Sequence, residues 1–208
     1  GDDVRMVNVT AWGGPSAMIL YYAGGPGTNI TVRNFAGENA TYGVYWNAGA
    51  SNASLQNIFI RNVSSGFYGV ADGLVTFTNF VLRDAAFGLN PQSGYTQAVN
   101  LRGADFANVS QPVYWYYGRA LNISESAFSD AAGNGIEFAV AGAILELVNV
   151  SLNNISRYGV YVTSGLNWTG GWVNATYEGA YVEWGSTSAN VSNVTFTNIG
   201  DVAFIVGS

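Results

Sequence analysis

The side chains of this sequence that could do chemistry are carboxylates, guanidinium groups, phenols and amides. The 208 residues include 13 Asp and Glu and seven basic residues, all of them arginine, and they contain no histidine, cysteine or lysine. Histidine-based catalysis, disulfides and metal sites built from thiolates or imidazoles are therefore excluded. We expect no catalytic residue, no cofactor and no metal site.

The carboxylates do not gather at any point of the sequence. Asp84, Asp105 and Asp130 come closest, because the repeat described below places them on three successive coils. Glycoside hydrolysis needs two carboxyl groups about 5 to 10 Å apart across an open cleft. The wide spacing favours ordinary turn and surface acids, and we expect a protein that is not an enzyme.

Charge and hydropathy limit the kinds of partner that the chain can bind. The formal net charge is −6 and the isoelectric point is near 4.3, which argues against nucleic acid because phosphate binding needs clustered basic residues. No apolar run approaches the roughly 20 residues that span a bilayer, so we expect no membrane span. With 49% apolar and only 10% charged residues, the chain needs another source of solubility.

N-linked glycans could supply that solubility. The acceptor motif Asn-x-Ser/Thr occurs 13 times, whereas random placement of 22 Asn and 30 Ser and Thr predicts roughly three. Turns favour the same residue types, which explains part of the excess. The motif count predicts an extracellular or cell-surface glycoprotein. The preferred acceptors are Asn29, Asn39, Asn52, Asn122, Asn149, Asn167, Asn190 and Asn193. The other five acceptor motifs, which coincide with the ladder described below, are at Asn8, Asn62, Asn108, Asn154 and Asn174.

A repeat runs through the whole chain. The seven-residue template x-Φ-x-Φ-x-[Asn/Asp]-Φ, where Φ is apolar, fits nine times, beginning at residues 3, 29, 57, 79, 103, 125, 149, 169 and 193. A second short apolar segment, such as YGVYW or YGVYV, follows each copy. The shared period near 23 residues predicts an all-β solenoid in one domain, residues 1–208. A β-sandwich would not explain why the same turn residue returns in each copy.

The run NVSLNNISRYGVYV, residues 149–162, resembles the parallel β-helix repeat of the pectin-lyase-like superfamily, and NITVRNF, NIFIRNV and NVTFTNI are similar to it. The resemblance covers nearly the whole chain. It implies a right-handed parallel β-helix of about nine coils. It does not select a function, because that superfamily includes lyases, hydrolases, tailspikes, adhesins and surface-layer proteins.

Stacking the template copies predicts a ladder of turn residues, similar to the asparagine ladder of that superfamily. Its members would be Asn8, Asn34, Asn62, Asp84, Asn108, Asp130, Asn154, Asn174 and Asn198. Five of these asparagines are also glycan acceptors, and a buried ladder amide cannot carry a sugar. We therefore expect Asn149, at an outward strand position, to be glycosylated and Asn154, in the ladder, to be bare.

Two further rows predict contact surfaces. Arg33, Arg61 and Arg83 share one template position on consecutive copies, and they would repel unless anions or local partners such as Glu38, Asp72 and Asp84 neutralise them. The outward position of the second segment carries Tyr45, Tyr114, Tyr161 and Tyr181. Such a row could pack on itself, bind a sugar or contact a protein.

Apolar template residues continue almost to both ends of the sequence, without an amphipathic capping helix. A solenoid exposes the backbone and core of its last coil unless something covers them. Three explanations are open: the sequence is part of a longer solenoid, loops cap its ends, or subunits stack end to end. We expect the third, a homo-oligomer that forms an end-to-end polymer and acts as a structural subunit of an extracellular filament or surface layer. The alternatives are a polysaccharide-binding or carbohydrate-cleaving module and an adhesin stalk.

Overall fold

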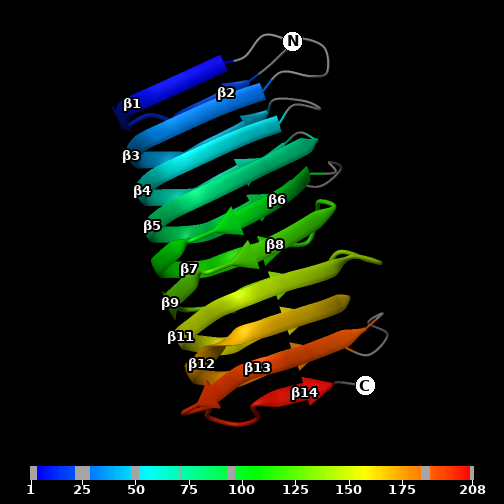
Figure 1. Cartoon of the computed structure of the whole chain (residues 1–208). Coiled ribbons are helices and arrows are strands. Elements are labelled where there is room, and N and C mark those ends of the chain that lie inside the picture. The colour runs from blue at the N-terminus through cyan, green and yellow to red at the C-terminus, as the bar shows by residue number, and fades with distance from the viewer. Residues whose placement is uncertain are drawn as a thin grey trace.

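The computed structural model describes residues 4–21, 29–47, 52–70, 72–92, 97–183 and 188–206. They form an all-β parallel solenoid in which bridged residues lie about 23 positions apart, as the sequence predicts (Figure 1). The chain descends through one stack of coils, from β1 at one end to β14 at the other. The strands are β1 (Val4–Trp12), β2 (Ser16–Tyr21), β3 (Asn29–Asn47), β4 (Asn52–Gly69), β5 (Gly73–Pro91), β6 (Gln97–Arg102), β7 (Asp105–Trp115), β8 (Ala120–Ser124), β9 (Ala127–Ala131), β10 (Ile136–Phe138), β11 (Ile144–Val162), β12 (Gly165–Val182), β13 (Ala189–Thr197) and β14 (Phe204–Val206).

The number of turns is about eight. The nine coils expected from the sequence correspond to nine stacked positions, which eight turns connect. One row of equivalent residues illustrates this count. It begins at Val4 and ends at Ala189, and each member pairs with the equivalent residue of the next coil. Its members are Val4, Ile30, Ala53, Val75, Val99, Leu121, Leu145, Leu166 and Ala189. At the spacing of hydrogen-bonded strands, about 4.8 Å, the stack is roughly 38 Å tall.

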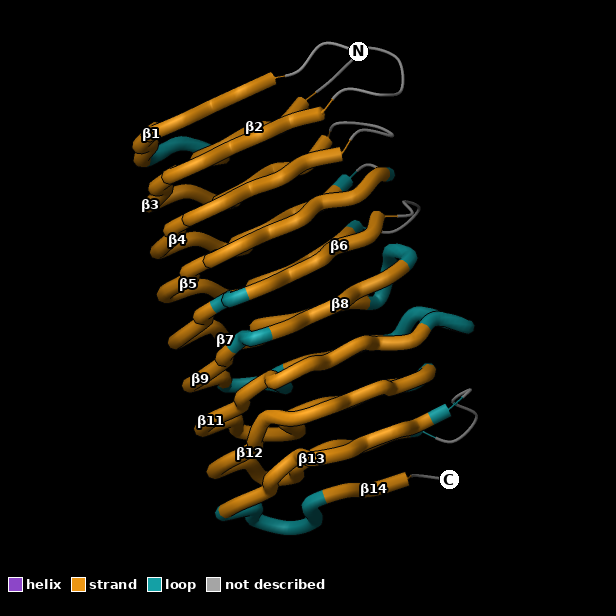
Figure 2. The backbone as a smooth tube through the Cα atoms, viewed as in Figure 1, coloured by secondary structure: helices purple, strands orange, loops and turns teal. Residues whose placement is uncertain are grey.

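Each coil has three straight segments separated by corners, and β3 shows the plan. The first segment covers residues 30–33, the second covers 35–38 and the third covers 44–46. Buried and exposed side chains alternate along the first segment, where Ile30 and Val32 point into the core. The strand assignment runs through the corners, so that long strands such as β3 bend around the solenoid (Figure 2).

Two residues in each coil turn the chain in left-handed backbone. In β3 they are Asn34, with φ of 54°, and Asn39, with φ of 58°. Asparagine is among the few residues that adopt this conformation readily. The first corner is formed by Asn8, Asn34, Asn57, Asn79, Gly103, Glu125, Asn149, Gly170 and Asn193. The second corner is formed by Gly13, Asn39, Asn62, Asp84, Asn108, Asp130, Asn154, Ala175 and Asn198.

The structure therefore divides the single ladder expected from the sequence into two. Asn8 and Asn34 belong to the first corner, whereas the later members, from Asn62 onward, belong to the second. Asn174 lies beside the second corner, which Ala175 occupies with φ of 54°. Both corners place Asn before an apolar residue, so the same template fits either one.

A third row, at the start of the third segment, has almost no side chains. Its members are Gly43, Gly66, Gly88, Pro112, Gly135, Gly159, Gly179 and Ala203. A Cβ on Gly88 would lie 2.0 Å from the carbonyl oxygen of Pro112, and one on Gly159 would lie 2.5 Å from that of Gly179. Successive coils approach too closely here for a methyl group. We call this row the glycine row.

The interior is filled by stacked apolar side chains, the largest of which include Trp46, Trp115 and Trp168. Ser126 is one of the polar residues that the structure buries. Its buried hydroxyl accepts a hydrogen bond from the Ala104 amide over 3.0 Å and donates to the Ser124 carbonyl over 2.7 Å. Both of its hydrogen-bonding roles are satisfied, so a hydroxyl is tolerated in the core.

The outermost coils are less well covered than the middle of the stack. Among the described residues, β1 and β2 pair only with β3 on one side, and β13 and β14 pair only with β12. Inward residues of these coils, such as Val9 and Val194, are only partly buried. In the part of the chain that the structure describes, there is no helix that is long and apolar enough to cross a membrane.

Candidate functional site

The first corner builds a ladder of side-chain amides. The Nδ2 of Asn34 donates to Oδ1 of Asn8 over 2.8 Å, that of Asn57 donates to Asn34 over 2.9 Å, and that of Asn79 donates to Asn57 over 3.0 Å. The run stops at Gly103, which has no side chain. Further along the stack, Asn149 donates to Glu125 over 3.0 Å.

The second corner carries a ladder that is broken into pairs. Asn62 donates to Asn39 over 2.6 Å, Asn108 donates to Asp84 over 2.6 Å, and Asn154 donates to Asp130 over 2.8 Å. A carboxylate accepts hydrogen bonds and has none to donate. Asp84 and Asp130 therefore accept from the next coil but cannot pass the ladder to the coil before.

The end of the second ladder passes through Asn174 rather than the corner residue. The amide of Asn174 donates to Oδ1 of Asn153 over 2.8 Å, and its own oxygen accepts from Asn198 over 2.7 Å. Ala175, at the corner itself, offers no polar side chain. Asn174 is thus a ladder residue by hydrogen bonding, although it is not one by backbone position.

All 13 glycan-acceptor asparagines lie among the described residues, and none of them is buried. Asn167 and Asn174 are half-buried, and the other 11 are exposed. The expected conflict between ladder and glycan rested on a buried ladder, whereas both corners lie at the surface. Asn149 is itself a corner residue and not an outward strand residue, so its surroundings match those of Asn154. Occupancy at each position remains a prediction.

The acceptors avoid one side of the solenoid. They lie on the first and second segments and at the two corners that flank the second segment, and the third segment carries none. Four of them, Asn39, Asn62, Asn108 and Asn154, lie at the second corner, which leads into the third segment. If the acceptors are occupied, the third segment is the side that sugars leave free.

The third segment carries a row of aromatic residues that we call the tyrosine strip. In coil order the row is Ile19, Tyr45, Tyr68, Asn90, Tyr114, Glu137, Tyr161, Tyr181 and Ile205. The structure brings together the four tyrosines named from the sequence and adds Tyr68. The rings of Tyr45 and Tyr68 stack with centroids 5.7 Å apart, and those of Tyr161 and Tyr181 stack at 5.4 Å.

Glu137 interrupts the strip with a polar cluster that the sequence did not reveal. The Tyr116 hydroxyl donates to its Oε1, and the amides of Gln111 and Asn134 donate to its Oε2, the latter over 2.8 Å. Burial, followed by the hydrogen bond to Glu137, raises the pKa of Tyr116 well above its ordinary value. Burial is also the main cause of the raised pKa of Tyr114, two residues before Tyr116.

The arginines do not form the expected strip. Arg33 lies at the end of the first segment and pairs with Gln56, whereas Arg61 and Arg83 are neighbours on the second segment. Two of the three have acidic partners on an adjacent coil. Arg61 meets Glu38 over 2.6 Å, and Arg83 forms an ion pair with Asp105. The template placed Arg33 with the others because it merged the two corners.

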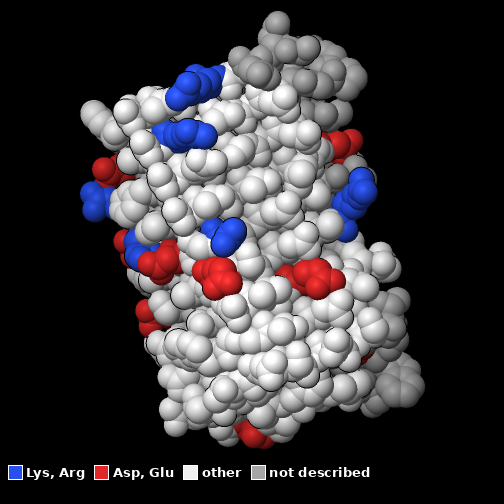
Figure 3. Space-filling model, in the orientation of Figure 1, with Lys and Arg blue, Asp and Glu red and all other residues white. Residues whose placement is uncertain are grey.

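Charged side chains are unevenly spread over the surface. On the face in Figure 3 they gather over the N-terminal half, and the C-terminal half is almost entirely uncharged. Within the described ranges, no group of three or more acidic residues is arranged to hold a metal ion.

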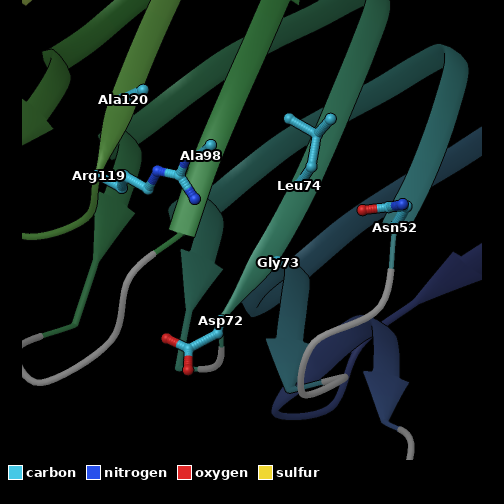
Figure 4. Close-up of a pocket in the computed structure, with 7 residues that line it drawn as sticks. All are labelled: Asn52, Asp72, Gly73, Leu74, Ala98, Arg119 and Ala120. Carbon is cyan, nitrogen blue, oxygen red and sulfur yellow. The ribbon is translucent and has the colours of Figure 1, made fainter. Parts of the chain in front are cut away.

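A shallow depression of about 430 Å³ lies where the first segments of successive coils begin. In Figure 4 it runs past Asn52, Leu74, Ala98 and Ala120, which are stacked neighbours, with Arg119 and Asp72 beside them. The small side chains of the two alanines create the hollow. A glycan on Asn52 would lie over it, so the depression is a poor candidate for a substrate site.

No protein-family model matches this sequence, and no match is found among curated proteins either. The fold and the surfaces described above are therefore the basis for any functional argument.

Proposed function

We propose that this protein is a structural subunit of an extracellular, N-glycosylated filament or surface layer, and that its subunits stack end to end as a continuous solenoid. The proposal includes membership of the pectin-lyase-like superfamily, which the sequence resembles, and a right-handed coil. The glycans would provide the solubility that the small number of charged side chains does not.

End-to-end assembly is inferred from the two open end coils. Among the described residues β1 pairs only with β3, so its other edge is open, with partly exposed apolar residues such as Met6 and Val9 beneath it. β13 presents the complementary edge with Val194 and Phe196. Two such ends can continue the parallel ladder across a subunit boundary, which is strand addition of the kind that joins many protein chains.

Two variants, each with one end of the solenoid blocked by a charge, test this assembly. Val9→Asp places a charge at the first coil, and Val194→Asp places one at the last coil. We expect each variant alone to be unable to polymerise and an equal mixture to form heterodimers, because each variant retains one intact end. Negative-stain electron microscopy and sedimentation provide the readout, with circular dichroism to verify folding. A wild-type protein that shows no association through its ends at high concentration would overturn the proposal.

The alternative function is a polysaccharide-binding or carbohydrate-cleaving module, and the tyrosine strip with its amide and carboxylate groups favours it. An acidic polysaccharide fits poorly. Arg61 and Arg83 are ion-paired and lie on the second segment, away from the tyrosines of the third. Release of reducing ends or unsaturated products from a polysaccharide panel would establish cleavage, and retention on a neutral glycan array would establish binding. The adhesin stalk remains a variant of the structural role.

A further inference from the structure

The tyrosine strip has nearly the same sequence in both directions. From one end it reads Ile, Tyr, Tyr, Asn, Tyr, Glu, Tyr, Tyr, Ile, with Tyr114 at its centre. Counted outward from Tyr114, Asn90 matches Glu137, Tyr68 matches Tyr161, Tyr45 matches Tyr181 and Ile19 matches Ile205. These positions are fixed by the strand pairing and lie on nine consecutive coils.

A row with this property is complementary to a second copy of itself. A two-fold axis that runs along the strands through Tyr114 would bring two strips face to face with their coil orders reversed. Each apolar or aromatic residue would then face one of its own kind. A two-fold interface between identical chains requires this kind of self-complementary surface.

The one unlike pair is also complementary, because Asn90 of each copy would face Glu137 of the other. Glu137 already accepts three hydrogen bonds, from Tyr116, Gln111 and Asn134. A carboxylate offers about four lone-pair sites, so one acceptor site remains. The amide of Asn90 supplies the donor that this site lacks. An adjacent row adds a second such match, in which Tyr42 would face Glu178.

The size and the surroundings of the strip suit such a contact. A stack about 38 Å tall and a strip about 16 Å wide, which includes the adjacent row and spans residues 42–46 in β3, give roughly 600 Å² on each copy, or about 1,200 Å² in total. That area is at the lower limit of stable, specific protein interfaces. The third segment carries no glycan acceptor, so a sugar coat on the rest of the surface would leave this contact open.

We propose that the tyrosine strip is a lateral interface through which two copies of this chain pair side by side in antiparallel orientation. This inference does not depend on stacking through the ends, because it uses a different surface. Together, the two contacts would convert single rods into ribbons or layers.

Cross-linking tests the register. The chain has no cysteine, so an introduced thiol is the only one present. Facing strands lie about 10 Å apart, beyond the reach of a disulfide, so a short bismaleimide is the appropriate reagent. We expect Tyr114→Cys to cross-link to itself. Tyr45→Cys and Tyr181→Cys should cross-link only when mixed, because like positions would lie six coils apart. Phe59→Cys, on the second segment, is the control and should not react across copies.

Three results would overturn the proposal in this experiment. They are no cross-linked dimer from Tyr114→Cys, self-linking of Tyr45→Cys, and equal linking of Phe59→Cys. Subunits joined only through their ends would keep two Tyr114 residues nine coils, about 43 Å, apart, so end-to-end polymers cannot imitate the self-linking of Tyr114→Cys. Tyr181 of one subunit and Tyr45 of the next would lie three coils, about 14 Å, apart across such a junction, so the mixed pair is tested on the Val194→Asp background, which removes end stacking. Failure of lateral pairing is thereby distinguished from failure of end-to-end assembly.

Affinity provides an independent measurement. On the Val194→Asp background, which removes end stacking, we expect Tyr114→Glu to weaken dimerisation about 30-fold, as loss of a central aromatic contact does. Asn90→Asp preserves side-chain shape and places a second carboxylate against Glu137, and it should weaken pairing at least tenfold. Phe59→Glu, an equivalent change on an exposed aromatic of another segment, should leave the dimer within threefold of the parent. A monomeric parent at about 100 µM, or equal effects of Tyr114→Glu and Phe59→Glu, would contradict the lateral interface.

Discussion

Asn149 and Asn154 stand at the two ends of one second segment and have equivalent surroundings. Both adopt left-handed backbone, with φ of 51° and 53°, and both donate a side-chain amide to a carboxylate of the preceding coil, Glu125 and Asp130 respectively. Both are exposed. The sequence suggested that one would be glycosylated and the other bare, and the structure removes the reason for that difference.

We therefore predict that Asn149 and Asn154 are both glycosylated in native material. Glycosylation replaces one of the two amide hydrogens and leaves the other to donate, so an exposed ladder amide can carry a sugar. Glycopeptide mass spectrometry measures the occupancy. Asn198 is the natural control, since it is an exposed second-corner asparagine without the acceptor motif and should be unmodified. A map with sugar on Asn149 and none on Asn154 would contradict the prediction.

Restoring an amide at a broken ladder position should stabilise the protein. In Asp130→Asn the new Nδ2 can donate to Asn108 on the preceding coil while its oxygen still accepts from Asn154. We expect the free energy of unfolding to rise by about 0.5 to 1.5 kcal/mol, the net contribution of one hydrogen bond. Urea unfolding measures the change. Asp201→Asn removes an equal charge outside the ladder, so an equal gain in that variant would attribute the effect to net charge.

The glycine row should not tolerate a methyl group. In Gly88→Ala the added Cβ would meet the Pro112 carbonyl oxygen at 2.0 Å, and the backbone of two coils would have to separate. We expect a loss of about 2 to 3 kcal/mol in the free energy of unfolding. Gly142→Ala is the matched control. Its Cβ would meet nothing within 4 Å, and its left-handed backbone with φ of 73° should cost about 1 to 2 kcal/mol. Gly88→Ala should therefore be the more damaging change.

Alkaline pH should lower the stability of the fold through the tyrosines in and beside the third segment. Burial and nearby phenols or carboxylates raise the pKa values of Tyr68, Tyr114, Tyr116, Tyr158 and Tyr161 above 10 in the folded state. Below about pH 10 these phenols are protonated in both states, so their contribution to stability is complete. Above pH 10 the unfolded chain loses its protons first, and stability falls as the pH rises towards the folded pKa values.

The size of the alkaline effect identifies its source. Each such tyrosine contributes up to about 1.4 kcal/mol per pH unit to the decline of the unfolding free energy with pH. We predict that unfolding free energy measured in urea is nearly flat from pH 7 to pH 9 and declines above pH 10. Tyr116→Phe should decline less steeply, since one proton fewer is released on unfolding. A Tyr116→Phe profile with the wild-type slope would show that this phenol is not shifted.

The sequence predicted the solenoid and its period because both depend on local patterns. Apolar alternation followed by Asn or Asp recurs in each coil, and the side chains that face inward are specified one residue at a time. The register between coils was harder to predict. Between Asn34 and Asn62 the template moved from the first corner to the second. The sign of this change in the sequence was the interval between the template starts at residues 29 and 57, which is 28 residues.

The candidate surfaces depended on that register, and this is why they were predicted only in part. Arg33 was grouped with Arg61 and Arg83 through the merged corners. Tyr68 was missed because the run GFYG contains two glycines three positions apart, and Gly66 rather than Gly69 belongs to the glycine row. The cluster around Glu137 joins residues 21 and 26 positions apart with no shared motif, so only the stacking of coils reveals it.

The asparagine ladders also give the rod an electrical direction. Among the described residues, 11 asparagine amides donate to a neighbouring coil, and each donates to the coil that precedes it. Their dipoles add in the same sense as those of an α-helix, with the positive end at β1 and the negative end at β13. Stacked subunits that keep one polarity would sum these dipoles along a filament, whereas antiparallel neighbours would cancel them.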